Sequence, residues 1–451
     1  MGVTGNLAKR MPGSVKRIYY RAVPFSYRYE RTYRDTLRGL LANETRPTLD
    51  LLEEQRLNFL DLVDHACRHV PFYRDHFREN GLSIKDFEGI EDINKLPLVN
   101  KIIISADPAR FLDERLDPRQ LIEFKTSGST GVKFKFYGTD QMFKREAAFV
   151  TRAYLSHGSR LYDDWSIWIR RYVPDRDGAP LFKADHELRR VYMSAYHLNN
   201  KSVHEYVGLI NRLRHKTIST YPSTAYSLAC LIEEEGLKMP FVESIHLASE
   251  MLADQWAEKI AEILPGVKVR AHYGQMEKCS FFHQVEGGKY VDNVEYGVTE
   301  FVDIAGQTKV IGTGFLNRAM PFIRYDIGDT VEPLEAAAVQ IGLPATVKRF
   351  IGRSDDIIIT PEGNRLPGVN FYTMMYKIAG VKMFQIIQES ADTVRVKIVP
   401  NTDWTPEMAE FTRAKLAERL GSMKIEIEEC DEIERSKRTG KIRCILNAAN
   451  L

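Results

Sequence analysis

The sequence lacks the features that mark membrane-spanning and exported proteins. It contains no run of about 18 apolar residues, and its N-terminus has no apolar signal-peptide region. The start Met-Gly-Val-Thr-Gly-Asn also lacks the Ser or Thr of a myristoylation signal. These absences predict a cytoplasmic location.

Cysteines are few and scattered. The five cysteines form no C-x-x-C pair and show no finger-like spacing, which predicts reduced thiols and no structural zinc. Cys279 and His283 are close enough in sequence to share a metal ion. Ordinary packing is the favoured interpretation of this pair, because no second pair lies nearby.

Neither sign of charge is in excess over the whole chain. The 63 basic and 61 acidic residues give a formal net charge of +2, which does not favour nucleic acid as a partner. Only residues 1–40 are clearly basic, with nine basic and two acidic side chains. A solvated basic face of helical segments is the favoured interpretation, and contact with an anionic membrane surface is the alternative.

The length and composition that are present fit a globular protein of several domains. The 451 residues exceed the roughly 250 to 300 at which single hydrophobic cores stop growing. A hydrophobic content of 44% and a charged content of 27% are ordinary for such a protein. We therefore expect two or more domains.

The periodicity of apolar residues predicts an α/β architecture. In residues 51–67 they recur at three-residue steps, which is helical spacing, and Pro71 should stop this helix. Further along, β-rich runs at 165–169 and 242–247 alternate with helical stretches. The helical stretches are 202–214, 224–235 and 253–264, with Ser223 expected as an N-terminal cap and Gly236 as a left-handed closing residue. Trp165 and Trp168 are expected in the core.

The pattern changes after residue 350. Four short β-rich runs and one helix over 406–419 predict a small, separate α+β domain of about 100 residues. The predicted organisation is a large N-terminal domain, residues 1–350, whose first 120 residues are a mostly helical lead-in, and a mobile C-terminal domain, residues 351–451.

One glycine-rich segment is suited to holding phosphate. Residues 126–131 read Thr-Ser-Gly-Ser-Thr-Gly and are followed by Lys133 and Lys135. Small residues let backbone amides approach oxygen anions, and the lysines add positive charge. The register does not match the common NTPase loop, and Gly312-Thr-Gly314 likewise fails the dinucleotide-binding pattern. Taken alone, the segment is more typical of a flexible turn.

Further short motifs follow in a fixed order. They are Ala248-Ser-Glu250, Tyr273-Gly-Gln-Met-Glu277, the stretch from Asn317 to Asp329, Gly352-Arg-Ser-Asp-Asp356 and Arg438-Thr-Gly-Lys441. With the glycine loop, these motifs resemble the adenylate-forming superfamily of acyl- and aryl-CoA synthetases. The phrases Val70-Pro-Phe-Tyr73, Ser194-Ala-Tyr-His-Leu198 and Tyr221-Pro-Ser223 resemble its phenylacetate-CoA ligase and CapK-like branch. The resemblance spans about residues 65–445.

The resemblance implies a large multi-sheet α/β domain of the acetyl-CoA synthetase type with a small mobile α+β domain hinged near Asp355. It implies that the ATP phosphates lie around Thr126, Ser127, Gly128, Ser129, Thr130, Gly131 and Lys135. It implies that adenine and ribose lie among Ser249, Glu250, Tyr273, Gly274, Gln275, Asp329 and Arg353. Glu277 would hold Mg²⁺, Lys441 would be the adenylation lysine, and Tyr221, Ser223 and Ala248 would line an acid pocket.

The function implied is ATP-dependent activation of a small organic acid, with an aryl acid favoured, through an acyl-AMP. CoA is the leading acyl acceptor, and a carrier-protein thiol or a sugar amine in surface-polysaccharide synthesis is the alternative. A catalytically silent nucleotide-binding protein is a further alternative. It remains open because Lys133 replaces the usual proline after the loop and Met276 replaces the usual hydroxyl residue before Glu277. Taken singly, Asp329 and Arg353 read as a surface ion pair, Glu277 as a solvated carboxylate and Tyr273 as a core aromatic.

Overall fold

The computed structural model describes most of the chain. The described residues are 31–127, 133–160, 163–170, 172–174, 180–304, 307–333, 344–353, 357–361, 365–368, 371, 374–436 and 441–448, with a few single positions before residue 31. The chain forms two compact units. The N-terminal unit holds Met1–Ile327 with Val331–Arg349, and the C-terminal unit holds Gly328–Thr330 with Phe350–Leu451.

Several helices precede the first strand. The α-helices are α4 (Arg31–Asn43), α5 (Thr48–His69), α6 (Pro71–Glu79) and α7 (Lys101–Ala106), and four 3₁₀ turns lie at Ile84–Asp86, Ile90–Lys95, Pro108–Phe111 and Pro118–Gln120. The predicted helix over 51–67 is confirmed as part of α5. Pro71 takes the first position of α6. A backbone N–H at this position has no partner within the helix, so proline costs no hydrogen bond there. Among the described helices, none has the length and apolar run that a membrane crossing needs.

A two-stranded hairpin and a long helix come next. Strands β1 (Ile122–Ser127) and β2 (Lys133–Gly138) pair antiparallel, and α8 (Asp140–Leu155) follows. The side chain of Thr139 accepts from the Met142 N–H and caps α8. Helix α8 packs on α4 in a buried cluster that includes Tyr33, Phe149 and Tyr296.

The largest sheet has twelve strands in the order β11-β12-β13-β14-β10-β9-β8-β7-β6-β3-β5-β4. Strands β5, β3, β6, β7 and β8 run parallel, and β4 and β9 run antiparallel to the strands at the two ends of this block. The strands are β3 (Ser166–Arg170), β4 (Phe182–Asp185), β5 (Arg190–Ser194), β6 (Thr217–Thr220), β7 (Ser244–Ala248), β8 (Lys268–Gly274), β9 (Phe281–Gln284), β10 (Tyr290–Asp292), β11 (Gly297–Ile304), β12 (Gln307–Gly314), β13 (Tyr325–Pro333) and β14 (Thr346–Arg353).

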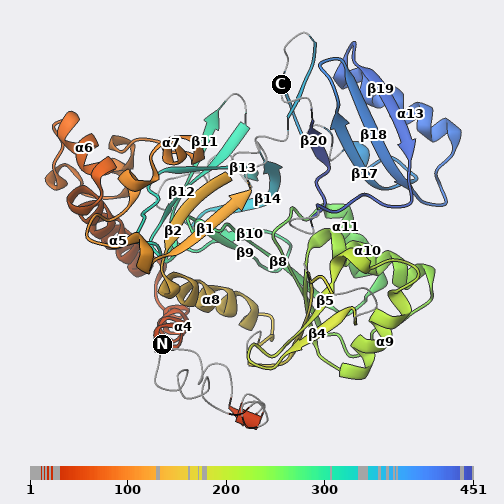
Figure 1. Ribbon diagram of the computed structural model, residues 1–451, viewed down its shortest axis with the longest axis horizontal. Coiled ribbons are helices and arrows are strands. Elements are labelled where there is room, and N and C mark those ends of the chain that lie inside the picture. Colours follow the sequence, from red (N-terminus) through yellow and green to blue (C-terminus); the bar gives the residue numbers. More distant parts are fainter. Residues whose placement is uncertain are drawn as a thin grey trace. The chain divides into compact units, whose positions relative to one another are not determined.

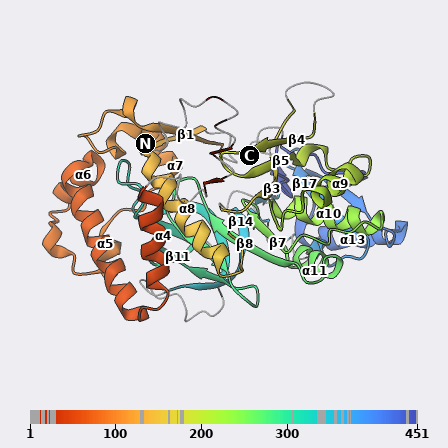
Figure 2. The same cartoon turned by 90° about the horizontal axis from the view of Figure 1, so that it is seen from below.

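Three helices connect the parallel strands and lie on one side of them (Figures 1 and 2). They are α9 (Val203–Leu213), α10 (Pro222–Glu234) and α11 (Asp254–Ile263), which confirms the predicted alternation of strand and helix. Gly236 has φ +61° and closes α10 as expected. The expected cap was wrong, because Tyr221 is the cap residue and Ser223 lies inside the first turn after Pro222.

The two faces of the parallel block differ in chemistry. Because side chains alternate along a strand, the register places Ile167, Ile169, Ile218, Ile245 and Leu247 on one face, and all five are at most 1% exposed. The opposite face, called the polar face below, consists of Arg190, Tyr192, Ser194, Ser166, Trp168, Arg170, Thr217, Ser219, Ser244, His246, Ala248, Arg270 and His272. Tyr154 of α8 stacks on His246 of this face, with 3.6 Å between ring centroids. Helix α8 therefore covers part of the polar face, and α9–α11 cover the apolar one.

The C-terminal unit is a small α+β unit. Strands β17 (Val381–Gln388), β18 (Thr393–Pro400), β19 (Lys424–Glu429) and β20 (Ile445–Asn447) form a sheet in the order β19-β18-β17-β20, with α13 (Pro406–Leu420) between β18 and β19. Strands β15 (Ile357–Ile359) and β16 (Arg365–Pro367) form a separate hairpin. The amide of Gln388 bonds the Ile359 backbone in both directions, at 2.9 and 2.6 Å, and so ties β15 to β17.

Candidate active site

Several predicted site residues gather at the carboxyl ends of the parallel strands. Ser194 ends β5, Tyr221 follows β6, Ala248 ends β7 and Gly274 ends β8. In open parallel sheets, ligands bind outside this edge, where loops leave the strands. The fold thus brings together segments that are up to 80 residues apart in the chain, between Ser194 and Gly274.

The register orders four side chains into a row along this edge. Ser194 pairs with Arg170, Thr220 pairs with both Ile169 and Leu247, and Ala248 pairs with His272. Because alternate residues share a face, Arg170, Tyr221, Ala248 and His272 follow one another on the polar face. The guanidinium of Arg170 lies over the Tyr221 ring at 5.1 Å, which agrees with this order. Two of the predicted acid-pocket residues, Tyr221 and Ala248, therefore flank one another beside a cation.

The Ala248-Ser-Glu250 turn leaves β7 with an uncommon backbone. Ser249 has φ +75°, a left-handed conformation that serine rarely adopts. Directly after it, the Glu250 carboxylate accepts from the Ser223 N–H at 3.0 Å, at the positive N-terminal end of α10. Glu250 thereby joins the ends of β7 and α10, and Ser249 lies exposed between them.

The predicted phosphate loop connects β1 to β2. Gly128, Ser129, Thr130 and Gly131 lie outside the described residues, whereas the backbone of Thr126 and Ser127 is the end of β1. Lys135 points to the outer side of the hairpin and pairs with Glu123 at 2.5 Å. Hydrogen bonds to Glu123 and Tyr137 raise the pKa of Lys135 to about 12, so this cation stays charged near the loop.

The turn that carries Glu277 is built by close backbone packing. Lys278 has φ +59° and is buried, and its ammonium pairs with Glu146 of α8 at 2.6 Å. A Cβ on Gly314 would lie 2.1 Å from the Lys278 carbonyl oxygen, and one on Gly312 would lie 2.7 Å from the Cys279 Cβ. The Gly312-Thr-Gly314 segment therefore serves as the support on which the Glu277 turn packs.

An aromatic contact joins the Glu277 turn to the glycine-loop hairpin. The Tyr325 hydroxyl donates to Glu277 Oε1 at 3.5 Å. The Tyr325 ring stacks on Phe134, at 6.1 Å between centroids and 16° between planes. Phe134 is the backbone partner of Thr126 in the hairpin. Tyr325 therefore contacts the hairpin through its ring and Glu277 through its hydroxyl.

The Asn317–Met320 stretch anchors the other end of the hairpin. The Asn317 amide donates to the Tyr137 carbonyl at 2.9 Å, and the Tyr137 N–H donates to the Met320 sulfur at 3.4 Å. These bonds hold β2 against the segment that leads into Tyr325. Three of the motifs found in the sequence thus form one connected structure.

Tyr273 and Gln275 occupy the segment between β8 and Glu277. The Tyr273 ring meets Phe282 edge-on at 6.1 Å and is partly buried. With its amide oriented to its partners, Gln275 donates to the Ser280 carbonyl at 2.8 Å and accepts from the Ser280 N–H at 3.1 Å. The Gln275 side chain therefore closes the turn around Glu277.

Other predicted residues belong to the C-terminal unit. Asp329 lies in β13 and is partly buried, and Gly328 before it has φ +80°. The backbone of Arg353 ends β14, while its side chain, Asp355 and residues 438–440 lie outside the described part of the chain. Lys441 is partly buried, and its carbonyl accepts from the Ser436 N–H at 2.9 Å.

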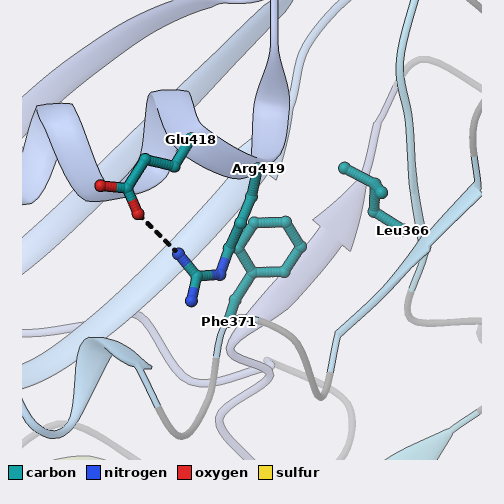
Figure 3. A pocket seen from close by; sticks show the side chains of 4 residues that line it. All are labelled: Leu366, Phe371, Glu418 and Arg419. Atoms are coloured by element: carbon teal, nitrogen blue, oxygen red, sulfur yellow. Dashed lines mark ion pairs between the residues drawn. The ribbon is translucent and has the colours of Figure 1, made fainter.

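A cavity of about 470 Å³ in the C-terminal unit contains none of these residues (Figure 3). It is lined by Leu366, Phe371, Glu418 and Arg419, and the last two form an ion pair at 3.8 Å. Its lining offers no group with an evident role in acid activation.

Comparison with known proteins found a matching family model and similar curated proteins. The family model described as the CapK C-terminal domain matches residues 358–448. Protein CapK of Staphylococcus aureus is 26% identical over 384 residues, which cover 83% of each chain. A phenylacetate-coenzyme A ligase of Thermus thermophilus is 26% identical over 349 residues, or 72% of this chain and 74% of the ligase.

This chain is similar to CapK and to phenylacetate-coenzyme A ligases along most of its length. The predicted resemblance to CapK and the phenylacetate-coenzyme A ligases is confirmed by these relatives, and two of the relatives are ligases by name. A 2-hydroxyisobutyryl-CoA ligase in the postadenylation state, in complex with 2-HIB-AMP, has the same fold, with a TM-score of 0.64, 17% identity and 89% of each chain covered. The predicted fold class, a large multi-strand α/β part with a smaller C-terminal sheet domain, is confirmed.

One residue at the edge of the parallel strands was not predicted from the sequence. Arg170 is the last residue of β3, inside a β-rich run that gives no sign of which face it uses. Trp168 was wrongly expected in the core, since it is only partly buried and lies between Arg170, at 5.1 Å, and Arg190, at 3.7 Å from its ring. A charged residue at the end of an apolar strand was the available signal.

Proposed function

We propose that this protein activates a small organic acid with ATP, forming an acyl-AMP and pyrophosphate, and then transfers the acyl group to an acceptor. The observation that carries the proposal is the joining of the glycine-loop hairpin to the Glu277 turn through Phe134 and Tyr325. A phosphate-binding loop beside a carboxylate is the arrangement that a magnesium nucleotide needs. The acid would bind at the neighbouring strand edge.

The donor set around Glu277 fits Mg²⁺. Magnesium prefers hard oxygen ligands and is commonly held by one or two carboxylates together with substrate phosphates. Among the described residues, no group of three or more His, Cys, Asp or Glu side chains forms a complete metal cage. Glu277 would therefore hold the ion jointly with ATP, and the bound ion would neutralise charge as pyrophosphate leaves.

The first half-reaction needs positioning and charge, with no protein nucleophile. A carboxylate oxygen of the acid attacks the α-phosphorus, and the bond from this phosphorus to the pyrophosphate oxygen breaks. Backbone amides of the glycine loop and Lys135 would hold the phosphates in line. Asp329 would accept from the ribose hydroxyls, with Arg353 nearby, and Ser249, Gly274 and Tyr273 would border the adenine.

In the second half-reaction an acceptor attacks the acyl carbon and AMP leaves. CoA is the leading acceptor, because the homologues include phenylacetate-coenzyme A ligases and a similar fold was solved with 2-HIB-AMP and CoA. A carrier-protein thiol is the second candidate. A sugar amine is an equal alternative to the carrier-protein thiol.

Pyrophosphate exchange into ATP tests the proposal without knowledge of the acceptor. The purified protein is incubated with ATP, Mg²⁺, labelled pyrophosphate and one acid at a time from a panel of aryl and aliphatic acids. We expect exchange that depends on the acid. Nucleotide binding without exchange for any acid would favour the catalytically silent alternative.

Lys441 is proposed to serve the first half-reaction alone, as the resemblance implies for the adenylation lysine. We predict that Lys441→Ala loses most acyl-AMP synthesis but keeps near-normal thioester formation from supplied acyl-AMP. Lys424→Ala, a change of an exposed lysine in the same unit, is the control and should alter neither step. Equal losses in both half-reactions would contradict this role, and no loss in either would make Lys441 an ordinary surface residue.

A further inference from the structure

Arg170 is a cation beside the proposed acid site, and it forms no ion pair among the residues that the structure describes. Its Nη2 donates to Ser219 Oγ at 3.0 Å and to the Thr220 carbonyl at 3.4 Å, both neutral acceptors. Its Nε is buried and has no hydrogen-bond partner among the described residues. No ion pair within 4 Å joins Arg170 to a described carboxylate. A guanidinium in such a place has donors left for a ligand.

The surroundings of Arg170 make its positive charge costly unless an anion binds to it. The rings of Trp168 and Tyr221 each lie 5.1 Å from its guanidinium and shield it from water. Burial lowers the pKa of Arg170, which means that its charged form is poorly compensated. A second cation, Arg190, stacks on the far side of Trp168 at 3.7 Å.

Neighbouring ionisable groups on the polar face add no negative charge. His246 is 1% exposed, and both of its ring nitrogens lack hydrogen-bond partners among the described residues. Burial lowers the pKa of His272 to about 3 and that of His246 well below its usual value, so both rings are neutral. The charge of Glu250 acts to raise the pKa of Arg170, but an oxygen of Glu250 already accepts from the α10 backbone.

We propose that Arg170 binds a second anionic group of the acid, so that the substrate is an acid with two anionic groups. This inference rests on the proposed function and narrows its substrate class. The row along the strand edge gives the geometry, since Arg170, Tyr221 and Ala248 are consecutive on one face. An acid lying along Tyr221 would present its reacting carboxylate to the nucleotide and its other anion to Arg170. Planar guanidinium forks suit carboxylate and phosphate oxygens.

The inference changes the expected pocket chemistry. The sequence favoured an aryl acid, with Tyr221, Ser223 and Ala248 expected to line its pocket. The row instead combines the aromatic side chain of Tyr221 with a guanidinium. An aryl acid remains suitable if its ring carries a second anionic substituent.

The test compares matched acids that differ by one charge. The pairs are hexanoate with adipate, and phenylacetate with its ring-carboxylated derivatives, all assayed by pyrophosphate exchange. We expect the unaltered protein to prefer the dianionic member of a pair. Arg170→Met keeps the length of the side chain and removes the charge, and it should lower kcat/KM for the dianion by roughly 100-fold while changing that for the monoanion by less than about 3-fold.

Two variants separate recognition from folding. Arg170→Lys keeps the charge without the fork and should recover part of the preference. Arg270→Met changes another partly buried arginine of the polar face, whose Nη1 donates to the Val269 carbonyl at 2.8 Å, and should leave the preference unchanged. An equal loss for both members of each pair in Arg170→Met would overturn the inference and leave Arg170 a packing residue.

A binding measurement separates this inference from the proposed function. Trp168 lies beside Arg170, so dianion binding should change its fluorescence, and Trp168→Phe should abolish that change. Dianion binding without exchange for any acid would support the Arg170 site and contradict the proposed reaction. Exchange with monoanionic acids alone would support the reaction and contradict the Arg170 site.

Discussion

Two arginines of the N-terminal unit show how differently one side chain can be used. Arg324, in the turn before β13, is 8% exposed and makes an ion pair with Glu300 at 2.8 Å. It also donates to the Leu96 carbonyl and to Asn94 Oδ1, both at 2.9 Å. Arg170, at the end of β3, donates to neutral acceptors within the described part of the chain. The first arginine is satisfied by the fold, whereas the second keeps donors for a ligand.

The two settings predict effects of very different size for the same substitution on stability. Breaking a buried ion pair leaves an uncompensated charge, which typically costs about 3 to 5 kcal/mol. We therefore predict a loss of that size for Arg324→Met, measured by urea unfolding. The double variant Arg324→Met with Glu300→Leu should recover much of the loss, because no charge is left unpaired. Wild-type stability in the single variant would remove the basis of the comparison.

Asp292 extends the comparison to a buried acid without a cation. It is 7% exposed, and burial raises its pKa to about 7. A hydrogen bond from the Thr299 hydroxyl, at 3.4 Å, lowers the pKa by less than burial raises it. Its folded pKa is above its unfolded value, so the folded state keeps a proton that the unfolded state loses. Stability from this group is therefore full below about pH 4 and is lost as the pH rises through 7, by up to about 4 kcal/mol.

Asp292→Asn should remove this pH dependence. We predict that the free energy of unfolding of this variant changes less between pH 5 and pH 8 than that of the unaltered protein. Parallel curves for the two proteins would mean that Asp292 is already ionised in the fold.

Glu277 is the carboxylate counterpart of Arg170, since it too is placed for a ligand in our account. Glu277→Gln keeps the shape and removes the charge. Acyl-AMP formation should lose about 2 to 4 kcal/mol of transition-state stabilisation, while unfolding is little affected. Unchanged exchange kinetics would contradict the magnesium role.

The smallest predicted effect is the stability of Arg170→Met. Because the guanidinium has no ionic partner among the described residues, its removal should change the free energy of unfolding by no more than about 1 kcal/mol. A loss as large as that of Arg324→Met would show that Arg170 is structural.

The sequence was sufficient to predict the elements and the motifs that meet. Hydrophobic periodicity located α5, α9, α10 and α11. At the start of α10 the predicted cap was Ser223, whereas the cap residue is Tyr221. The role of Gly312 and Gly314 could not be predicted, because it depends on the approach of a backbone from the Glu277 turn. Arg170 was overlooked for a similar reason, since strand alternation does not say which face meets a site until the register across β3, β6 and β7 is known.

The most direct test of the central claim follows one oxygen atom. An acid labelled with ¹⁸O in its carboxylate is incubated with ATP, Mg²⁺ and the protein, and hydroxylamine captures the acyl group whatever the natural acceptor. If the carboxylate attacks the α-phosphorus, AMP must leave with one ¹⁸O atom, detected by mass spectrometry. Label in inorganic phosphate, with ADP as the nucleotide product, would contradict acyl-AMP formation.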